Sequence, residues 1–264
     1  MERAGAGWPR ARARVVTAGF RPTVRVMTWN IHGAHGRNPR FDLNRVIALI
    51  ERHSPDVVAL QEVDSRRPRE SGMAEPFAML QEALGFHGIG AKSIVTQDGE
   101  YGQALISRWP MRNAEVHDIS YQEREPRRAI RCMIDAPCGA LRVIATHLGL
   151  SVGERRDQAR ALLGLIGEAA VTTVAMGDFN DWFWAGSVRK VLAARLPARS
   201  RHRTFPSMFP LFRFDRVYCS HASALLSVRT DPEARLLSDH LPVIAEIRPG
   251  GIRESLGQRV ALAG

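Results

Sequence analysis

Short apolar runs, each about as long as one β-strand, recur along the whole chain and constrain its fold more than any other feature. The clearest are residues 24–31, 56–63 and 171–178. Continuous apolar runs of this length are typical of strands that are covered on both faces. Further strands are expected at residues 101–107, 112–118, 128–135, 141–147, 214–219, 222–229 and 242–247.

Helical patterns separate only some of these runs. One stretch has apolar residues spaced as one face of a helix: Leu43, Val46, Ile47 and Ile50. We expect Asp42 to cap this helix and Pro55 to follow its end. Further helices are expected over residues 76–84, 153–170 and 186–194. Because many consecutive strands lack a helix between them, the sequence predicts an α/β fold with mixed sheets.

The length and composition of the chain suit one large globular core. Of its 264 residues 45% are hydrophobic, and no stretch approaches the roughly 20 apolar residues of a membrane-spanning helix. We expect one domain over residues 24–248, preceded by a poorly ordered basic segment over 1–23 and followed by a C-terminal tail over 249–264. We also expect the protein to be a monomer.

The chain is strongly basic, with a net charge of +10, and Lys92 and Lys190 are its only lysines. Genome composition is a sufficient explanation for such an arginine bias. Half of the excess charge lies within residues 1–25, which hold six arginines and one glutamate. The rest favours a phosphate-bearing substrate, with nucleic acid as one candidate, through long-range attraction.

The three cysteines, Cys132, Cys138 and Cys219, are odd in number and lack the spacing of a metal site. We interpret them as reduced, mostly buried thiols of a cytoplasmic protein. The N-terminal segment has no apolar stretch of signal-peptide length, although its arginines also fit an organelle transit peptide.

Polar side chains stand where the apolar runs end or in the loops that follow them. They are Asn30, Glu62, His147, Asp178, Asn180, Asp239 and His240. Strand ends on one rim of a sheet bring together residues that are distant in sequence, so we expect these side chains to converge. One carboxylate at a strand end is usually a turn or cap residue, but seven residues of these types together favour a functional site.

The chemistry that suits this set is metal-assisted attack on a phosphoester. Mg²⁺ prefers oxygen ligands and needs only one or two protein carboxylates, which Glu62 and Asn30 would satisfy. Asp178 suits the task of orienting a water molecule and taking its proton. Asn180, His147 and His240 are hydrogen-bond donors that can stabilise charge on phosphoryl oxygens. Asp215 is the expected partner of His240, as in the His–Asp pairs of hydrolytic triads.

Seven short motifs occur in the order that is found in the endonuclease/exonuclease/phosphatase superfamily. They read MTWNIHG, PDVVALQEVD, GQALISRWP, ATHL, AMGDFND, RFDRVY and SDHLPV. From about residue 24 to 248 the chain resembles a small, single-domain member of this superfamily. The resemblance implies a four-layer αββα sandwich, in which two mixed β-sheets are flanked by helices.

The resemblance also implies a cofactor and the residues near it. The cofactor would be Mg²⁺, sometimes Mn²⁺. Glu62 matches the main metal-binding carboxylate of the superfamily, and Asn30 matches its neighbour that holds the metal site or its waters. Asp239 matches the aspartate near the metal waters.

Other matched positions would handle the phosphate. Asp178 and Asn180 match the pair that positions the water and the phosphate. His240 matches the histidine at the phosphate, and Asp215 the aspartate that orients it. The position of His147 is often Tyr in abasic-site repair endonucleases and His in relatives that resemble deoxyribonucleases, sphingomyelinases, deadenylases and inositol-phosphate phosphatases. His147 therefore disfavours a dedicated repair enzyme and indicates a proton donor that works near neutral pH.

Arginines outside these motifs have both structural and functional interpretations. Arg127 and Arg128 precede an expected strand, where they are either a solvated edge or a grip on a phosphate. In the helix expected over 153–170, we place Arg155 and Arg156 on a solvated face, with Gln158 bonded to a nearby loop.

Aromatic residues also have two interpretations. Trp182 follows the GDFN motif and belongs either to the core or to a wall on which a substrate group stacks. The same choice applies to its neighbours in sequence and to a second aromatic segment: Phe183, Trp184, Phe205, Met208, Phe209 and Phe212. His32 and His35 lie close to Asn30 and are either substrate contacts or incidental residues of a glycine-rich loop.

The residues favour a Mg²⁺-dependent phosphodiesterase or nuclease. The alternative is a hydrolase of a phospholipid head group or a small phosphorylated metabolite, because one scaffold can serve many substrates. A non-enzymatic binding module is disfavoured because every metal and catalytic position is filled. A zinc hydrolase is disfavoured because the candidate ligands are mostly oxygen donors.

Overall fold

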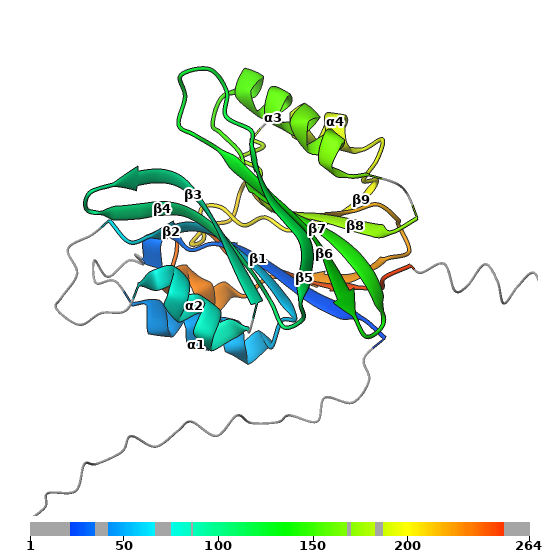
Figure 1. Cartoon of the computed structure of the whole chain (residues 1–264), viewed down its shortest axis with the longest axis horizontal. Helices are drawn as coiled ribbons and strands as arrows, with labels where there is room; N and C mark the ends of the chain where they lie inside the picture. Colours follow the sequence, from blue (N-terminus) through cyan, green and yellow to red (C-terminus); the bar gives the residue numbers. More distant parts are fainter. Residues whose placement is uncertain are drawn as a thin grey trace, which may run out of the picture.

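A computed structural model of the chain describes residues 22–34, 42–66, 75–85, 87–167, 170–182 and 187–250. Two mixed sheets of six strands pack face to face, and helices cover their outer sides (Figure 1). The predicted four-layer αββα sandwich is therefore confirmed. Most of the expected N- and C-terminal tails lies outside the described residues. In the described part of the chain, no helix has the length and apolar character needed to cross a membrane.

The first sheet has the strand order β11-β12-β1-β2-β4-β3. Strands β1 and β2 are parallel, whereas the other neighbours are antiparallel. Its strands are β1 (Val24–Asn30), β2 (Val57–Asp64), β3 (His87–Thr96), β4 (Gly99–Ser107), β11 (Leu225–Arg229) and β12 (Val243–Ile247). Helices α1 (Leu43–His53) and α2 (Pro76–Leu84) lie on its outer face (Figure 1).

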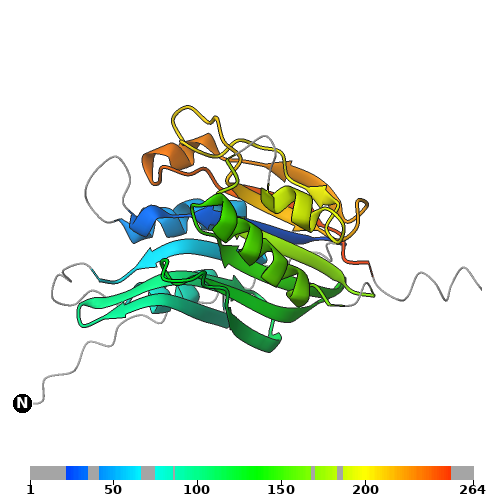
Figure 2. The ribbon, with the colours of Figure 1, turned by 90° about the horizontal axis from the view of Figure 1, so that it is seen from above.

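The second sheet has the order β5-β6-β7-β8-β10-β9. Here β7 and β8 are parallel and the other neighbours are antiparallel. Its strands are β5 (Met111–Asp118), β6 (Arg128–Ala136), β7 (Gly139–His147), β8 (Thr172–Asp178), β9 (Ala198–Arg199) and β10 (Asp215–Cys219). Helices α3 (Val152–Leu165) and α4 (Ser187–Leu192) cover its outer face (Figures 1 and 2).

Three apolar layers hold these elements together. Side chains from both sheets fill the central layer, and each sheet packs a second layer against its own helices. Helix α1 buries the four residues that the sequence pattern placed on one face, Leu43, Val46, Ile47 and Ile50, and Asp42 caps it as expected. Strand β8 is buried at every position because both of its faces are covered.

Several elements differ from the sequence-based expectation. Strand β3 was not anticipated, because Gly88 and Gly90 are poor strand formers, yet it pairs with β4 along its length. Helix α3 ends at Leu165 instead of residue 170, and Gly167 follows with a left-handed φ of 65°. The short strand β9 and two 3₁₀ helices, η1 (His32–Ala34) and η2 (Pro232–Leu236), were also missed.

The two parallel strand pairs determine where the polar strand ends meet. In one pair Asn30 lies opposite Gln61, and in the other His147 lies opposite Asp178. Both β1 and β2 contact β8 across the sandwich. The carboxyl ends of the parallel pairs therefore share one rim, which spans the seam between the two sheets.

Candidate active site

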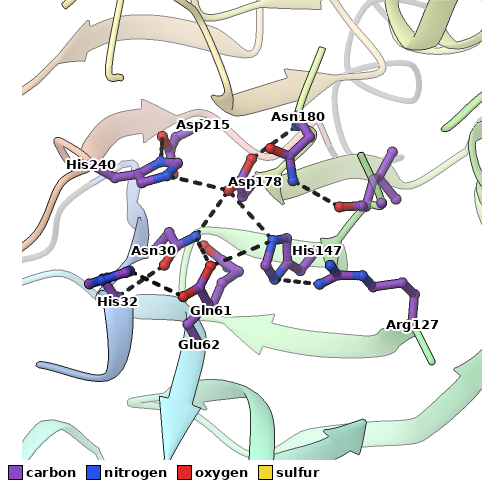
Figure 3. Close-up of polar contacts among 12 residues, drawn as sticks. Asn30, His32, Gln61, Glu62, Arg127, His147, Asp178, Asn180, Asp215 and His240 are labelled. Atoms are coloured by element: carbon purple, nitrogen blue, oxygen red, sulfur yellow. Dashed lines mark hydrogen bonds and ion pairs between the residues drawn. The ribbon is translucent and has the colours of Figure 1, made fainter. Parts of the chain in front are cut away.

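Glu62 reaches this rim because of an irregularity in β2. The pairing of β2 with β4 shifts register between Gln61 and Val63, and Glu62 itself has a left-handed φ of 57°. A bulge of this kind removes one residue from the ladder and redirects its side chain. The Glu62 carboxylate faces the rim and remains 23% exposed (Figure 3).

Asn30 connects the two sheets through its side-chain amide. Its Nδ2 donates to Glu62 Oε1 at 2.8 Å and to Asp178 Oδ2 at 3.0 Å (Figure 3). Its Oδ1 accepts a hydrogen bond from the backbone N–H of His32 at 3.0 Å. Asn30 thus fixes the separation of two carboxylates that come from opposite sheets.

His32 lies between two carboxylates on the open side of the rim. Its Nδ1 is 3.5 Å from Glu62 Oε2 and 3.6 Å from Asp239 Oδ1. The hydrogen bond to Glu62 and the charge of Asp239 raise the pKa of His32 above its usual value. Burial opposes ionisation of Glu62, but hydrogen bonds from His32 and Asn30 outweigh it and lower the pKa of Glu62 to about 2. The ionised Glu62 carboxylate and the side chain of Asp239 therefore both face His32, on a side of the rim that solvent reaches.

Asp178 is almost completely buried at the rim. Its Oδ1 accepts the backbone N–H of Asn180 at 2.9 Å. Its Oδ2 lies 3.6 Å from His147 Nε2 and 3.8 Å from His240 Nε2 (Figure 3). Burial and the charge of Asp215 raise the pKa of Asp178, so it holds a proton more readily than an exposed aspartate.

His240 forms the predicted pair with Asp215. Nδ1 of His240 is 2.8 Å from Asp215 Oδ2, and Asp215 is fully buried. Burial alone would lower the pKa of His240, but the charges of Asp215 and Asp178 raise it to about 10. Ser238 positions this segment, because its Oγ donates to the carbonyl oxygen of Asn30 at 2.7 Å and accepts the N–H of His240 at 3.1 Å. Ser238 was missed by sequence reasoning although it belongs to the SDH motif.

His147 is held by Arg127 rather than by a carboxylate. Arg127 is only 5% exposed, and its Nη1 lies 3.0 Å from His147 Nδ1. Because a guanidinium has only donors, Nδ1 must accept and Nε2 carries the hydrogen. Burial and the charge of Arg127 lower the pKa of His147 to about 3, so the ring is neutral at neutral pH. The sequence left Arg127 as either a solvated edge or a grip on a phosphate, and its burial against His147 shows that the solvated edge is wrong.

The other candidate residues have different surroundings. Asn180 has a left-handed φ of 48°, and its Nδ2 donates to the carbonyl oxygen of Leu148 at 2.9 Å. Arg128 pairs with Asp118. Trp182 is 44% exposed, and Phe183 and Trp184 lie outside the described residues.

Helix α3 corrects one expectation about its arginines and confirms another contact. Arg155 was expected on a solvated face, but it is fully buried and its Nη1 donates to the carbonyl oxygen of Leu150. It lies at the start of the helix, where the charges of Asp181 and Glu154 interact with it. Arg156 is exposed as expected, and Gln158 Oε1 accepts the N–H of Gly149 at 2.8 Å.

Two groups of side chains offer donors to a divalent cation. Glu62 and Asp239 contribute carboxylate oxygens that solvent can reach, which suits Mg²⁺ with several waters. Potential ligand atoms of Asp178, Asp215 and His240 also lie within 4.8 Å of one another. In that cluster the facing atoms of Asp215 and His240 already bond to each other, and at the first position His32 lies between Glu62 and Asp239.

Comparison with known proteins identifies the family. The model of the endonuclease/exonuclease/phosphatase family matches residues 27–240, which include every residue of the rim. The chain belongs to the endonuclease/exonuclease/phosphatase family. The members of this family are phosphoester hydrolases of the nuclease and phosphatase types.

Relatives of known sequence or structure agree with this family membership. The protein YbhP of Escherichia coli (strain K12) is 33% identical over 246 residues, which cover 85% of this chain and 96% of YbhP. A family structure from Beutenbergia cavernae has a TM-score of 0.72 at 25% identity and covers 88% of this chain and 72% of its own. The mannosyl-6-phosphatase Bt3783 of Bacteroides thetaiotaomicron has a TM-score of 0.65 at 15% identity, covers 85% of this chain and 99% of its own, and shares the fold.

Proposed function

We propose that the chain is a divalent-metal-dependent phosphodiesterase that uses Mg²⁺ or Mn²⁺. The observation that carries this proposal is the convergence of Glu62, Asp178 and His240 on one rim, with Asn30 bonded to both carboxylates. Glu62 and Asp239 would hold the ion. Bound there, it would polarise a phosphoryl oxygen and offset charge in the transition state.

Asp178 is the group that would orient the attacking water. It is a buried carboxylate whose Oδ1 is fixed by the Asn180 N–H and whose Oδ2 faces the centre of the rim. Its raised pKa makes it a stronger base than an exposed aspartate, which suits proton removal from water. The hydrogen bond from Asn30 keeps this carboxylate in place during attack.

The two histidines would act differently on the phosphate. His240 is charged, so it can both stabilise a phosphoryl oxygen and supply a proton to the leaving oxygen. His147 is neutral and presents Nε2–H, so it acts as a hydrogen-bond donor only. This assignment differs from the expectation that His147 supplies the proton near neutral pH.

We place nucleic acid first among the substrates, because the chain is basic and aromatic side chains lie beside His240. A phospholipid head group or a small phosphorylated metabolite is the second candidate. Nucleic-acid binding depends steeply on salt, since each neutralised phosphate releases counterions. A small metabolite would show a much weaker salt dependence.

A panel of phosphoesters assayed with Mg²⁺ tests the proposal. It consists of plasmid DNA, RNA, inositol phosphates, sphingomyelin, bis-p-nitrophenyl phosphate and p-nitrophenyl phosphate. We expect hydrolysis of diesters that stops in excess chelator and returns when Mg²⁺ or Mn²⁺ is added. Equal activity with and without chelator, or no hydrolysis of any ester, would contradict the proposal.

A further inference from the structure

An arginine-rich cavity lies beside the proposed active site. Its volume is about 540 Å³, and Asp181, Trp182 and Phe212 form part of its wall. Leu211 and six arginines complete the lining; the arginines are Arg189, Arg199, Arg201, Arg203, Arg213 and Arg216. Among the lining residues that the structure describes, Asp181 is the single acidic one. We call this cavity the arginine pocket.

The arginine pocket and the proposed active site lie on opposite faces of the same strand end. Asp215 and Arg216 are consecutive in β10, so their side chains point to opposite faces of the second sheet. Asp215 bonds to His240 on the inner face, and Arg216 lines the pocket on the outer face. The two sites are thus separated by the rim of one sheet.

Aromatic rings connect the two sites across this rim. The ring centroid of Phe214 lies 6.0 Å from that of His240 and 5.5 Å from that of Trp182. Trp182 also contacts Phe212 at 5.9 Å and is 44% exposed. Trp182 therefore offers an apolar face between the catalytic histidine and the arginines, which suits a base, sugar or other flat group.

Five of the six pocket arginines form no ion pair with a carboxylate of the described residues. In the described parts of the chain, no ion pair joins an acidic side chain to Arg199, Arg201, Arg203, Arg213 or Arg216. Instead, Arg213 Nε donates to the carbonyl oxygen of Arg201 at 2.8 Å, and Arg216 Nη1 donates to that of Ser200 at 3.3 Å. Partial burial and repulsion by neighbouring arginines lower the pKa values of Arg199 and Arg213.

Arg216 adds a buried, unsatisfied donor to this surface. It is 8% exposed, and its Nε has no hydrogen-bond partner among the described residues. A buried guanidinium nitrogen without a partner is costly, and the residue that carries it also lines the cavity. Guanidinium groups bind phosphate oxygens through paired N–H donors, so phosphate is the anion that matches the lining.

We propose that the arginine pocket binds a second phosphate group of the substrate whose scissile phosphate lies at Asp178 and His240. The group between the two phosphates packs on Trp182. This proposal rests on the proposed function, because it takes the rim as the place of cleavage. The second phosphate belongs either to the backbone of a nucleic-acid strand or to a metabolite with two phosphates.

Direct binding of tripolyphosphate tests the pocket without any turnover. Calorimetry would compare the wild-type protein with a variant that carries both Arg201→Gln and Arg213→Gln, two exposed positions where glutamine keeps a polar group. The control carries Arg156→Gln and Arg160→Gln, which remove two charges from exposed positions of α3. We expect the pocket variant to bind tripolyphosphate at least tenfold more weakly and the control to remain within twofold of wild type.

The His240→Ala variant separates binding in the pocket from binding at the proposed active site. Tripolyphosphate affinity that persists in His240→Ala and is lost in the pocket variant supports the proposal. Equal affinity in wild type and pocket variant, with matching melting temperatures, would overturn it. If wild type hydrolyses no ester yet binds tripolyphosphate through these arginines, the proposed function fails and the anion-binding pocket stands.

Kinetics then distinguish the two sources of the phosphate. For each enzyme we would compare kcat/KM on bis-p-nitrophenyl phosphate, which has one phosphate, with kcat/KM on a thymidine pentanucleotide and on an inositol bisphosphate. We expect the pocket variant to lower the ratio of multi-phosphate to single-phosphate kcat/KM about tenfold, mainly through KM. A loss confined to the pentanucleotide identifies a strand, and one confined to the bisphosphate identifies a metabolite. Equal losses on all substrates would contradict a second-phosphate site.

Discussion

Nδ1 of His240 lies 2.8 Å from the fully buried carboxylate of Asp215, and this contact determines the charge of the histidine. Phe205 and Phe214 enclose the ring of His240, which burial alone would keep neutral. Asp215 outweighs burial, so the imidazolium faces Asp178 across 3.8 Å. Asp215 thus raises the pKa of His240, the proposed acid, and also that of Asp178, the proposed base.

Asp215→Asn should lower kcat by about a hundredfold or more, because His240 loses the partner that fixes its orientation and supports its charge. The change keeps the size of the side chain, so far-UV circular dichroism should be unchanged. Steady-state kinetics on the best diester of the panel measure the effect. A kcat within threefold of wild type would show that the pair is not needed for catalysis.

Arg127→Leu should raise the pKa of His147, because the neighbouring positive charge that lowers it is removed. Nitrogen-15 NMR of the labelled histidine measures this pKa and shows which ring nitrogen carries the hydrogen. We expect a tautomer mixture and a kcat about tenfold lower, since Nε2–H is no longer enforced. Arg131→Leu is the control, because Arg131 pairs with Glu115 instead. An unchanged His147 spectrum in Arg127→Leu would refute the assigned role.

Glu62→Gln should weaken Mn²⁺ binding at least tenfold, measured by calorimetry without substrate, and should abolish metal-dependent hydrolysis. The reason is the loss of a carboxylate that a hard cation requires. Glu82→Gln on the exposed side of α2 is the matched control. Binding that survives in Glu62→Gln but disappears in Asp215→Asn would place the ion in the cluster of Asp178, Asp215 and His240.

Asp231→Asn should lower the free energy of unfolding by about 2 kcal/mol at neutral pH. Asp231 caps η2 and accepts bonds from Arg52 and from His53 Nε2 at 2.7 Å, which join α1 to the segment leading to His240. Burial opposes its ionisation, but the bonds from His53, from the backbone N–H of Glu233 and from Arg52 lower its pKa.

The sign of the pH dependence follows from that lowered pKa. Asp231 contributes stability above its unfolded-state pKa, and this contribution is lost as pH falls through the folded-state value. The difference in unfolding free energy between wild type and Asp231→Asn should therefore shrink from neutral pH toward pH about 3. The exposed partner Glu233 is the control, and Glu233→Gln should cost less than about 1 kcal/mol. A pH-independent difference for Asp231→Asn would contradict this account.

Gly177→Ala should destabilise the fold by roughly 3 kcal/mol, as judged by urea unfolding. A Cβ at this position would lie 1.8 Å from the carbonyl oxygen of Thr146, and φ is 151°. The glycine therefore permits close contact between β7 and β8. Gly164→Ala on α3 meets nothing within 4 Å and should instead stabilise by about 0.5–1 kcal/mol.

Much of the fold follows from local patterns, because continuous apolar runs and helical spacing mark most strands and α1. The pairing of Asp215 with His240 could be predicted as well, since the motifs identify both residues. The features that local sequence patterns do not predict are those that depend on packing between elements. Burial of Arg155 and the position of Arg127 behind His147 arise from contacts between separate elements. The bulge that turns Glu62 to the rim likewise appears only when β2 pairs with β4.

The amide of Asn30 bonds one carboxylate from each half of the sandwich. Because of these two hydrogen bonds, the geometry of the proposed active site depends on how the two sheets pack against each other. A small slip between the layers would separate Glu62 from Asp178 while every strand stayed intact. Substitutions in the central apolar layer are therefore expected to abolish hydrolysis at denaturant concentrations at which the secondary structure persists.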